Sequence, residues 1–246
     1  MIRIDNERVI RARLSDAKFF YEEDQKLHIN TALLKLENIV FHEELGSIAD
    51  KVRRTRRIAD ALSSALQISQ EDADAVSRAA EICKFDLVTQ MVYEFPELQG
   101  VMGEDYARRA GEKEKVAKAV FQHYQPRFAG DDTPDSIVGS LVSIADKMDT
   151  IIGCFSIGII PTGSQDPYAL RRQAQGIVQI MLAQKLPISL SELLNIALDV
   201  HESLRKMKLS AHEVRTAIIE FFGLRVKKLL SENLRYDVVD AVITAD

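Results

Sequence analysis

Apolar residues recur every three or four positions along most of this chain, while glycine, proline and alternating β-branched residues are scarce. This spacing puts apolar side chains on one face of a helix. The clearest case spans residues 46–66, and its stripe consists of Ile48, Val52, Thr55, Ala59, Leu62 and Leu66. The pattern predicts an all-α fold with amphipathic helices around a shared core.

The same pattern predicts a series of helices with one long loop among them. The expected helices span residues 6–24, 32–40, 46–66, 70–93, 112–124, 137–152, 168–184, 190–206, 211–230 and 236–244. The stretch PELQGVMGEDYARRAGE, with three glycines, is expected to be a loop. A change to shorter helices places a domain boundary near residue 165, which gives domains 1–165 and 166–246. The final residues, AVITAD, continue a helical pattern, so we expect a piece of a longer protein.

Composition and charge limit the kinds of function. With 46% hydrophobic and 28% charged residues, the 246-residue chain can bury a substantial core. Its net charge of -5 means that nucleic acid would have to bind a local basic patch. Cys83 and Cys154 are too far apart in sequence to suggest a zinc motif or a disulfide framework, so a reducing cytoplasm is expected.

Neither targeting nor membrane insertion is expected from the sequence. The N-terminus is charged from its third residue and has no apolar segment typical of a signal peptide. The longest apolar run, residues 151–160, is interrupted by polar and glycine residues and is far shorter than the ~20 residues of a membrane span. We therefore expect no membrane partner.

Long segments of the chain resemble one known family, the β subunit of the bacterial two-subunit glycyl-tRNA synthetase. The matching segments, in order, are RVIRARLSDAKFFYEED (8–24), LGSIADKVRR (45–54), AAEICKFDLVTQMVYEFPELQGVMG (79–103), ADKMDTIIGCFSIGIIPTGSQDPYALRRQAQGI (145–177) and FFGLRVKKLL with YDVVDAV (221–242). EFPELQG and PTGSQDPYALRR are the most specific of these.

The resemblance implies a degenerate HD-like helical domain over residues 1–165, followed by a smaller helical domain that leads into the anticodon-binding domain. It implies a cytoplasmic glycine–tRNA ligase that joins glycine to tRNA(Gly) with ATP. The partners would be the α subunit, which would carry the adenylate chemistry with ATP and Mg, and tRNA(Gly). This piece would then contribute tRNA binding and assembly, hold no cofactor of its own and contain no catalytic residue.

A second function, a metal-dependent HD phosphohydrolase acting on nucleotides or RNA, requires a His, a His-Asp pair and a distant Asp as metal ligands. The first His position falls near Lys51, and Cys83-Lys84 stands where His-Asp is needed. Asp146 is the one ligand that remains. Since a protonated lysine cannot bind a cation, we expect that the metal site is lost.

Catalysis by other residues is not expected in this segment. Cys83 has no histidine near it in sequence and is interpreted as a small buried hydrophobic residue rather than a nucleophile. Asp146 and Asp149, three residues apart with Lys147 between them, are interpreted as a solvated or lysine-paired surface rather than an acid–base pair. A protein-interaction scaffold without RNA affinity remains a third possibility.

Two basic clusters are candidate tRNA contacts. In the first, a helical wheel places Arg53, Arg54 and Arg57 in solvent, with Lys51 and Arg56 at the flanks. The alternative is an ordinary charged surface, with the cations paired to Glu43, Glu44, Asp50 and Asp60. The second cluster, Arg171 and Arg172, follows PTGSQDP at a predicted helix start, where free N–H groups favour an anion.

The second cluster also has a structural interpretation, a corner between domains in which Asp166 or Ser164 caps the helix and excludes a phosphate. Candidate docking residues lie elsewhere. Phe19 points away from the apolar stripe of its helix, and Phe95, Leu98 and Met102 make the EFPELQGVMG stretch unusually apolar for a loop. Phe19 is expected to contact another domain or subunit rather than RNA. The EFPELQGVMG stretch is expected either to be buried beneath the core or to dock the α subunit or the tRNA acceptor end.

Overall fold

The computed structural model describes residues 2–204, 207–231 and 235. Side chains are described for these residues except 2–10 and 12. The expected helix at 236–244 lies outside these residues. The α-helices are α1 (Ile2–Asp24), α2 (Ile29–Lys35), α3 (Ile48–Ala65), α4 (Gln70–Ile82), α5 (Gln90–Glu94), α6 (Val101–Arg109), α7 (Glu114–Gln122), α8 (Ile137–Ser156), α9 (Leu170–Ala183), α10 (Leu190–Leu204) and α11 (Ala211–Ser231). Short 3-10 helices are η1 (Leu36–Asn38), η2 (Phe85–Val88) and η3 (Pro96–Leu98).

The all-α prediction is confirmed. The described strands are β1 (Val40–His42) and β2 (Gly46–Ser47), which pair antiparallel just before α3. Gly46 has φ of +86° and lies where a Cβ would collide with the Asp50 side chain, so glycine suits this turn.

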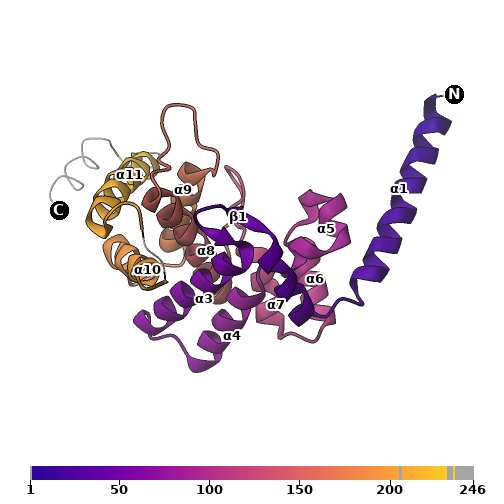
Figure 1. Ribbon diagram of the computed structural model, residues 1–246, viewed down its shortest axis with the longest axis horizontal. Helices are drawn as coiled ribbons and strands as arrows, with labels where there is room; N and C mark the ends of the chain where they lie inside the picture. The colour runs from indigo at the N-terminus through magenta and orange to yellow at the C-terminus, as the bar shows by residue number, and fades with distance from the viewer. Residues whose placement is uncertain (1, 205–206, 232–234, 236–246) are drawn as a thin grey trace.

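Helix α8 forms the centre of the molecule. Every residue from Val138 to Ser156 is buried, because α3, α4, α7, α9, α10 and α11 all pack around this helix (Figure 1). A helix that is apolar on all sides is expected at such a position. Three charged residues, Asp146, Lys147 and Asp149, nevertheless lie in its middle, and they build the site described below.

Helix α3 follows its predicted stripe and starts with a reciprocal cap. The hydroxyl oxygen of Ser47 accepts from the Asp50 N–H at 3.1 Å, and the Asp50 carboxylate accepts from the Ser47 N–H at 2.8 Å. This capping box fixes where the helix begins. Because α3 packs against α4, α8 and α10, its buried arc is wider than a single stripe.

Helix α1 projects from the body of the protein (Figure 1). The apolar stripe predicted for this helix consists of Ile10, Leu14, Ala17 and Tyr21. Leu14 is 65% exposed, so the stripe is not covered there, and Phe19 is 56% exposed. The C-terminal end of the helix is anchored by Asp24, whose carboxylate accepts from the N–H groups of Gln90 and Met91, each at 2.8 Å. These bonds join α1 to the start of α5.

Three predicted elements were wrong in the first half of the chain. The helix expected over 32–40 is α2, which ends at Lys35 and is followed by η1 and by strand β1 from Val40. The helix expected over 70–93 ends at Ile82, and α5 resumes only after η2. The expected loop from 96 to 112 instead contains η3 and α6. Gly103 serves close packing rather than flexibility, since a Cβ there would meet Val120 and Asp86 within 3 Å.

Residues beyond the predicted boundary at 165 share a core with those before it. Leu141 of α8, Ile177 of α9 and Phe222 of α11 belong to one apolar cluster. The division into 1–165 and 166–246 stays a prediction.

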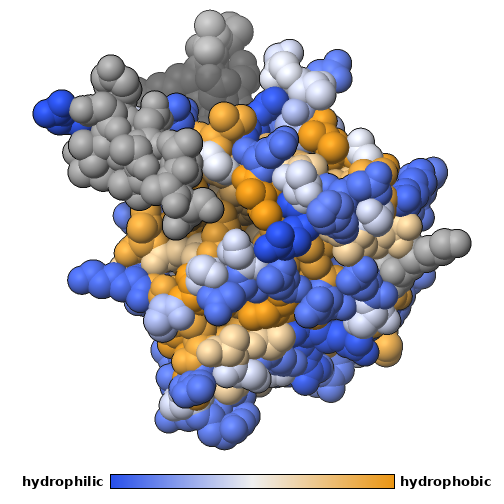
Figure 2. Space-filling model, turned by 90° about the vertical axis from the view of Figure 1, so that its left-hand side faces the viewer, coloured by the Kyte–Doolittle hydropathy of each residue, from blue (hydrophilic) through white to orange (hydrophobic). Residues whose placement is uncertain are grey.

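Figure 2 shows that the face carrying α10 and α11 mixes polar and apolar surface, and Ile219 and Leu224 of α11 are exposed. Among the described helices, none is long and apolar enough to cross a membrane.

Candidate functional site

Asp146 of α8 binds two lysine ammonium groups that come from separate parts of the chain. Lys51 Nζ of α3 lies 3.1 Å from Asp146 Oδ1, and Lys84 Nζ, just after α4, lies 3.1 Å from Asp146 Oδ2. Lys51 also donates to the Asp146 carbonyl at 2.9 Å and to Thr150 Oγ1 at 2.7 Å. All three side chains are buried, with residue exposures of 8% or less.

Asp149, one turn further along α8, collects the remaining cations. Arg54 Nε donates to Asp149 Oδ1 at 2.6 Å, and Lys51 Nζ lies 3.2 Å from Asp149 Oδ2. His201 Nε2 of α10 is 3.0 Å from Asp149 Oδ1. We call Lys51, Arg54, Lys84, Asp146 and Asp149 the buried ion cluster, and it ties α3, α8 and the end of α4 together.

The ion pairs dominate the protonation states within this cluster. Burial raises the pKa of both carboxyls, but the neighbouring cations, Lys51 first among them, outweigh burial and hold the pKa of Asp146 and Asp149 well below the usual range. Burial lowers the pKa of Lys51, and the two carboxylates more than offset this, so that its pKa is raised. Both carboxylates and the Lys51 ammonium are therefore charged at neutral pH.

The structure brings together the positions at which the phosphohydrolase alternative would need its metal ligands. Lys51 and Lys84 occupy both oxygens of Asp146, where a metal-dependent phosphohydrolase would need imidazole and carboxylate groups. Within the described part of the chain, no group of three or more His, Cys, Asp or Glu residues could hold a metal ion. This arrangement does not support the phosphohydrolase alternative.

Cys83 is fully buried, as the sequence indicated. Its Sγ lies 3.3 Å from the Ala80 carbonyl oxygen, and burial raises its pKa to about 12. A nucleophilic cysteine needs a thiolate, which this environment disfavours.

Asp146 and Asp149 were predicted to lie at the surface, and this was wrong because both are buried. Both are paired with lysine, as expected.

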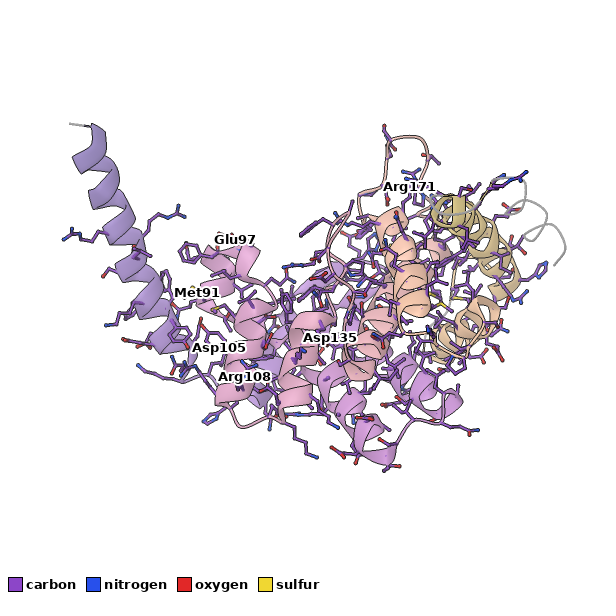
Figure 3. The ribbon with its side chains drawn as sticks, turned by 180° about the vertical axis from the view of Figure 1, so that it is seen from behind. Met91, Glu97, Asp105, Arg108, Asp135 and Arg171 are labelled. Carbon is purple, nitrogen blue, oxygen red and sulfur yellow. The ribbon has the colours of Figure 1, made fainter. Side chains whose placement is uncertain are left out.

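A pocket of about 440 Å³ opens above the buried ion cluster. Its lining includes the buried residues Lys51, Lys84, His123, Asp146 and Lys147 and the exposed rim residues Pro96, Glu97, Arg127 and Arg172. Figure 3 shows Glu97 and Arg171, the neighbour of Arg172, at the same edge of the molecule although they come from distant parts of the chain.

Two buried side chains in this pocket, Lys147 and His123, were not predicted as site residues from the sequence. Lys147 Nζ donates to the carbonyl oxygens of His123 and Gln125 at 3.1 and 2.8 Å, and burial together with the nearby cations Lys84 and Lys51 lowers its pKa to about 7, against the opposing effect of Asp146. Burial and Lys84 lower the pKa of His123 well below its usual value. The available signal was a run of charges, from 146 to 149, inside an otherwise apolar helix.

The basic cluster on α3 is divided between surface and interior. Arg53, Arg56 and Arg57 are exposed, but the prediction that Arg54 lies in solvent was wrong, and Lys51 is buried as well. Both point into the core because α8 supplies carboxylates there. These two side chains are excluded from direct surface contact with RNA.

Two exposed arginines of α3, Arg53 and Arg56, have acidic neighbours, and the alternative interpretation is confirmed in part, for Asp50 and Asp60 among the four acids that it named. Arg53 pairs with Glu37 and Asp50, each at 2.6 Å. Arg56 pairs with Glu81 at 2.9 Å and lies 3.9 Å from Asp60. Exposed pairs of this kind are weak and leave guanidinium groups able to exchange partners.

The backbone N–H groups at the start of α9 are already bound by Asp166 and are not available to an anion. Both oxygens of Asp166 are used, since they accept from the Leu170 and Arg171 N–H groups at 2.7 and 3.0 Å. A phosphate would compete with this carboxylate for the same donors. Arg172 instead reaches the rim of the pocket, so its side chain rather than the helix start can meet a ligand.

The candidate docking residues are only partly covered. Phe19 is 56% exposed, whereas Phe95, Leu98 and Met102 are half-buried. Met102 packs against the main core, and the Phe95 ring lies 5.5 Å from the Arg13 guanidinium of α1. Their role as a docking surface stays a prediction.

Comparison with known proteins identifies the family. Residues 1–244 match the family described as glycyl-tRNA synthetase beta subunit. The chain is 55% identical over 241 residues to the glycine–tRNA ligase beta subunit of Halalkalibacterium halodurans, which covers 98% of this chain and 35% of that protein. It is 56% identical over 239 residues to the same subunit of Bacillus subtilis, with 97% of this chain and 33% of that protein covered.

The chain thus spans about a third of the length of these curated relatives. The match runs through α3, the Lys84 region and α8, which carry the buried ion cluster, and through α9 at the rim of the pocket. This chain belongs to the family of glycyl-tRNA synthetase beta subunits.

Proposed function

We propose that this chain acts within a glycine–tRNA ligase as a helical module that binds tRNA(Gly) and joins neighbouring parts of the enzyme. The ATP- and Mg-dependent formation of glycyl adenylate then belongs to the separate α subunit, and the assembly works in the cytoplasm. The observation that carries the proposal is the identity above 50% over nearly the whole chain to two glycine–tRNA ligase beta subunits.

The geometry supports a binding role over a catalytic one. Cys83 is buried as a thiol, and both oxygens of Asp146 are held by ammonium groups. The charged residues at the centre therefore have structural partners. Of the candidate tRNA contacts, Arg53, Arg56 and Arg57 on α3 and Arg172 at the start of α9 are exposed, and Arg171 is half-buried.

Filter binding of tRNA(Gly) to the 246-residue chain tests the first surface. We expect affinity at low salt that falls steeply with added salt, because phosphate contacts release counterions. The triple substitution Arg53→Gln, Arg56→Gln and Arg57→Gln should weaken binding by about tenfold or more and reduce the salt slope.

A matched control removes three exposed cations elsewhere, Arg108, Arg109 and Lys113 at the end of α6 and the start of α7. The corresponding glutamine triple variant should bind as the unchanged chain does. Equal loss in both variants would show a dependence on net charge alone, and no loss in the α3 variant would remove this surface from the proposal. Absence of salt-sensitive binding in the parent chain would favour an interaction scaffold instead.

A further inference from the structure

The pocket above the buried ion cluster has a charge opposite to that of the protein as a whole. Five cations line it, Lys51, Lys84, Arg127, Lys147 and Arg172, against the carboxylates of Glu97 and Asp146. The formal charge of the lining is thus +3 with every lysine protonated, in a chain of net charge -5. A concave site with cations at its floor concentrates the field on anions.

Not every cation in the lining has a donor to spare. Lys147 Nζ donates to two carbonyls and to Ser143 Oγ, and Lys51 already meets four acceptors. Two of the three Arg127 guanidinium nitrogens, Nε and one Nη, bind Asp131. These side chains would act mainly through their charge.

Lys84 and Arg172 are placed to donate directly. The Lys84 ammonium has three N–H groups, of which one reaches Asp146 Oδ2 and one faces the Tyr124 ring, whose centroid is 4.2 Å away. A third N–H therefore remains for a ligand. The exposed guanidinium of Arg172 stands at the rim, where it can bind an anion with two parallel hydrogen bonds.

Whereas Lys84 and Arg172 offer hydrogen-bond donors to a ligand, His123 offers an acceptor. Its Nδ1 lies 2.6 Å from the Val120 carbonyl oxygen, which can only accept, so Nδ1 carries the proton. Nε2 is left as an acceptor, and this atom is fully buried without a hydrogen-bond partner among the described residues. A buried acceptor without a donor costs free energy, which a ligand hydroxyl in the pocket could recover.

We propose that this pocket binds a ribose phosphate of nucleotide size, with its phosphate on Lys84 and Arg172 and a ribose hydroxyl donating to His123 Nε2. The volume of about 440 Å³ is within the range of small-molecule pockets. The rings of Phe41, Tyr124 and Tyr168 in the lining offer apolar surface for a base. The site is independent of whether the α3 surface binds tRNA.

Isothermal titration calorimetry with the 246-residue chain tests the assignment, using AMP, inorganic phosphate, adenosine and 2′,3′-dideoxy-AMP as probes. AMP should bind, adenosine should bind at least tenfold more weakly because it lacks the anion, and dideoxy-AMP should be weaker than AMP because it cannot donate to His123. Inorganic phosphate should bind weakly and compete with AMP.

Variants locate the binding. Arg172→Ala removes an exposed side chain and should weaken AMP about tenfold without changing the fold, and Lys84→Met should weaken it further. Arg108→Ala, an exposed arginine on α6, should leave binding unchanged. If Lys84→Met fails to fold, Arg172→Ala alone decides whether the ligand occupies this pocket.

A short single-stranded RNA with a free 3′-hydroxyl distinguishes the source of the nucleotide. Tighter binding of the RNA than of AMP, with competition between them, assigns the pocket to an RNA end, and AMP binding without RNA binding assigns it to a free nucleotide. Binding of neither AMP nor RNA at millimolar concentration overturns the proposal, as does AMP binding that Arg172→Ala and Lys84→Met leave unchanged. These two results would overturn the pocket proposal alone and would leave the proposed tRNA binding by α3 untouched.

Discussion

At the scale of single residues, Asp149 is the side chain on which most buried charge depends. It is fully buried and lies within 3.3 Å of Lys51, Arg54 and His201. Buried charges are tolerated only when paired, because removing one partner leaves the others without compensation in a medium of low polarity. The stability of the core should therefore be sensitive to this carboxylate.

Asp149→Ala should lower the free energy of unfolding by about 3–5 kcal/mol, because Lys51 and Arg54 would lose their shared acceptor. Urea unfolding followed by circular dichroism measures the change. Glu114→Ala, which removes an exposed carboxylate paired with Arg108, is the control and should leave the urea midpoint nearly unchanged. A similar small effect at Asp149 would contradict the role assigned to the cluster.

Asp86 is a buried carboxyl whose pKa is raised, whereas the pKa values of Asp146 and Asp149 are lowered. Burial raises its pKa to about 6, against the hydrogen bond that its Oδ2 accepts from the Gly100 N–H at 2.7 Å. The unfolded chain releases this proton near pH 3.8, so the folded protein binds more protons between that pH and about 6. The free energy of unfolding contributed by Asp86 therefore falls as pH rises through this window.

Asp86→Asn keeps an acceptor for Gly100 and carries no charge. Compared with the unchanged chain, it should gain up to about 3 kcal/mol of stability as pH rises from 4 to 7, since two pKa units correspond to roughly that amount. Urea unfolding of both proteins at several pH values gives the difference, and effects of Asp146 and Asp149, common to both, cancel. A difference that does not change with pH would contradict the raised pKa.

At the scale of elements, the position of helix α3 was predictable from its own sequence, whereas the identity of its buried side chains depends on the helices that pack around it. Its apolar stripe located the start of helix α3 to within two residues, and the Ser47 cap in the structure lies at that point. Arg54 was misplaced because the wheel assumed one buried face, while α8 and α10 add a second. Nothing local to α3 reveals that its cations meet a carboxylate 95 residues later.

The segment from 96 to 112 was predicted as a loop because its glycines and proline were interpreted as breakers. Two of these residues permit helical turns to pack tightly instead, since Gly100 adopts φ of +82° and Gly103 approaches Asp86. The charges in α8 were visible in the sequence, but their burial was not, because apolar helices of this length are compatible with several packing arrangements.

The start of α9 depends on a side chain outside the helix. Asp166→Ala would leave the Leu170 and Arg171 N–H groups without their acceptors, at a cost of about 1 kcal/mol. A lower melting temperature in a thermal scan is expected, and the exposed Ser164→Ala in the same segment should have no effect. If Asp166→Ala melts at the same temperature as the unchanged chain, the cap contributes nothing.

At the scale of the whole molecule, six of the described helices pack around α8 (Figure 1). The charged residues in the middle of α8 lie beneath a cationic pocket. Sequence alone indicated the all-α class, the family and the displacement of metal ligands by lysine. It did not indicate the pocket, because that requires the spatial meeting of residues from 41 to 173. We propose that this part of the subunit holds RNA rather than activating glycine.

The most direct test measures two steps of the whole ligase separately. In the enzyme assembled from α subunits and complete β subunits, the β chain would carry the α3 triple substitution Arg53→Gln, Arg56→Gln and Arg57→Gln. Glycine-dependent exchange of pyrophosphate into ATP should stay at the level of the unchanged enzyme, while charging of tRNA(Gly) should fall, chiefly through a higher KM for tRNA. A parallel loss of both steps, or undiminished charging, would contradict the account.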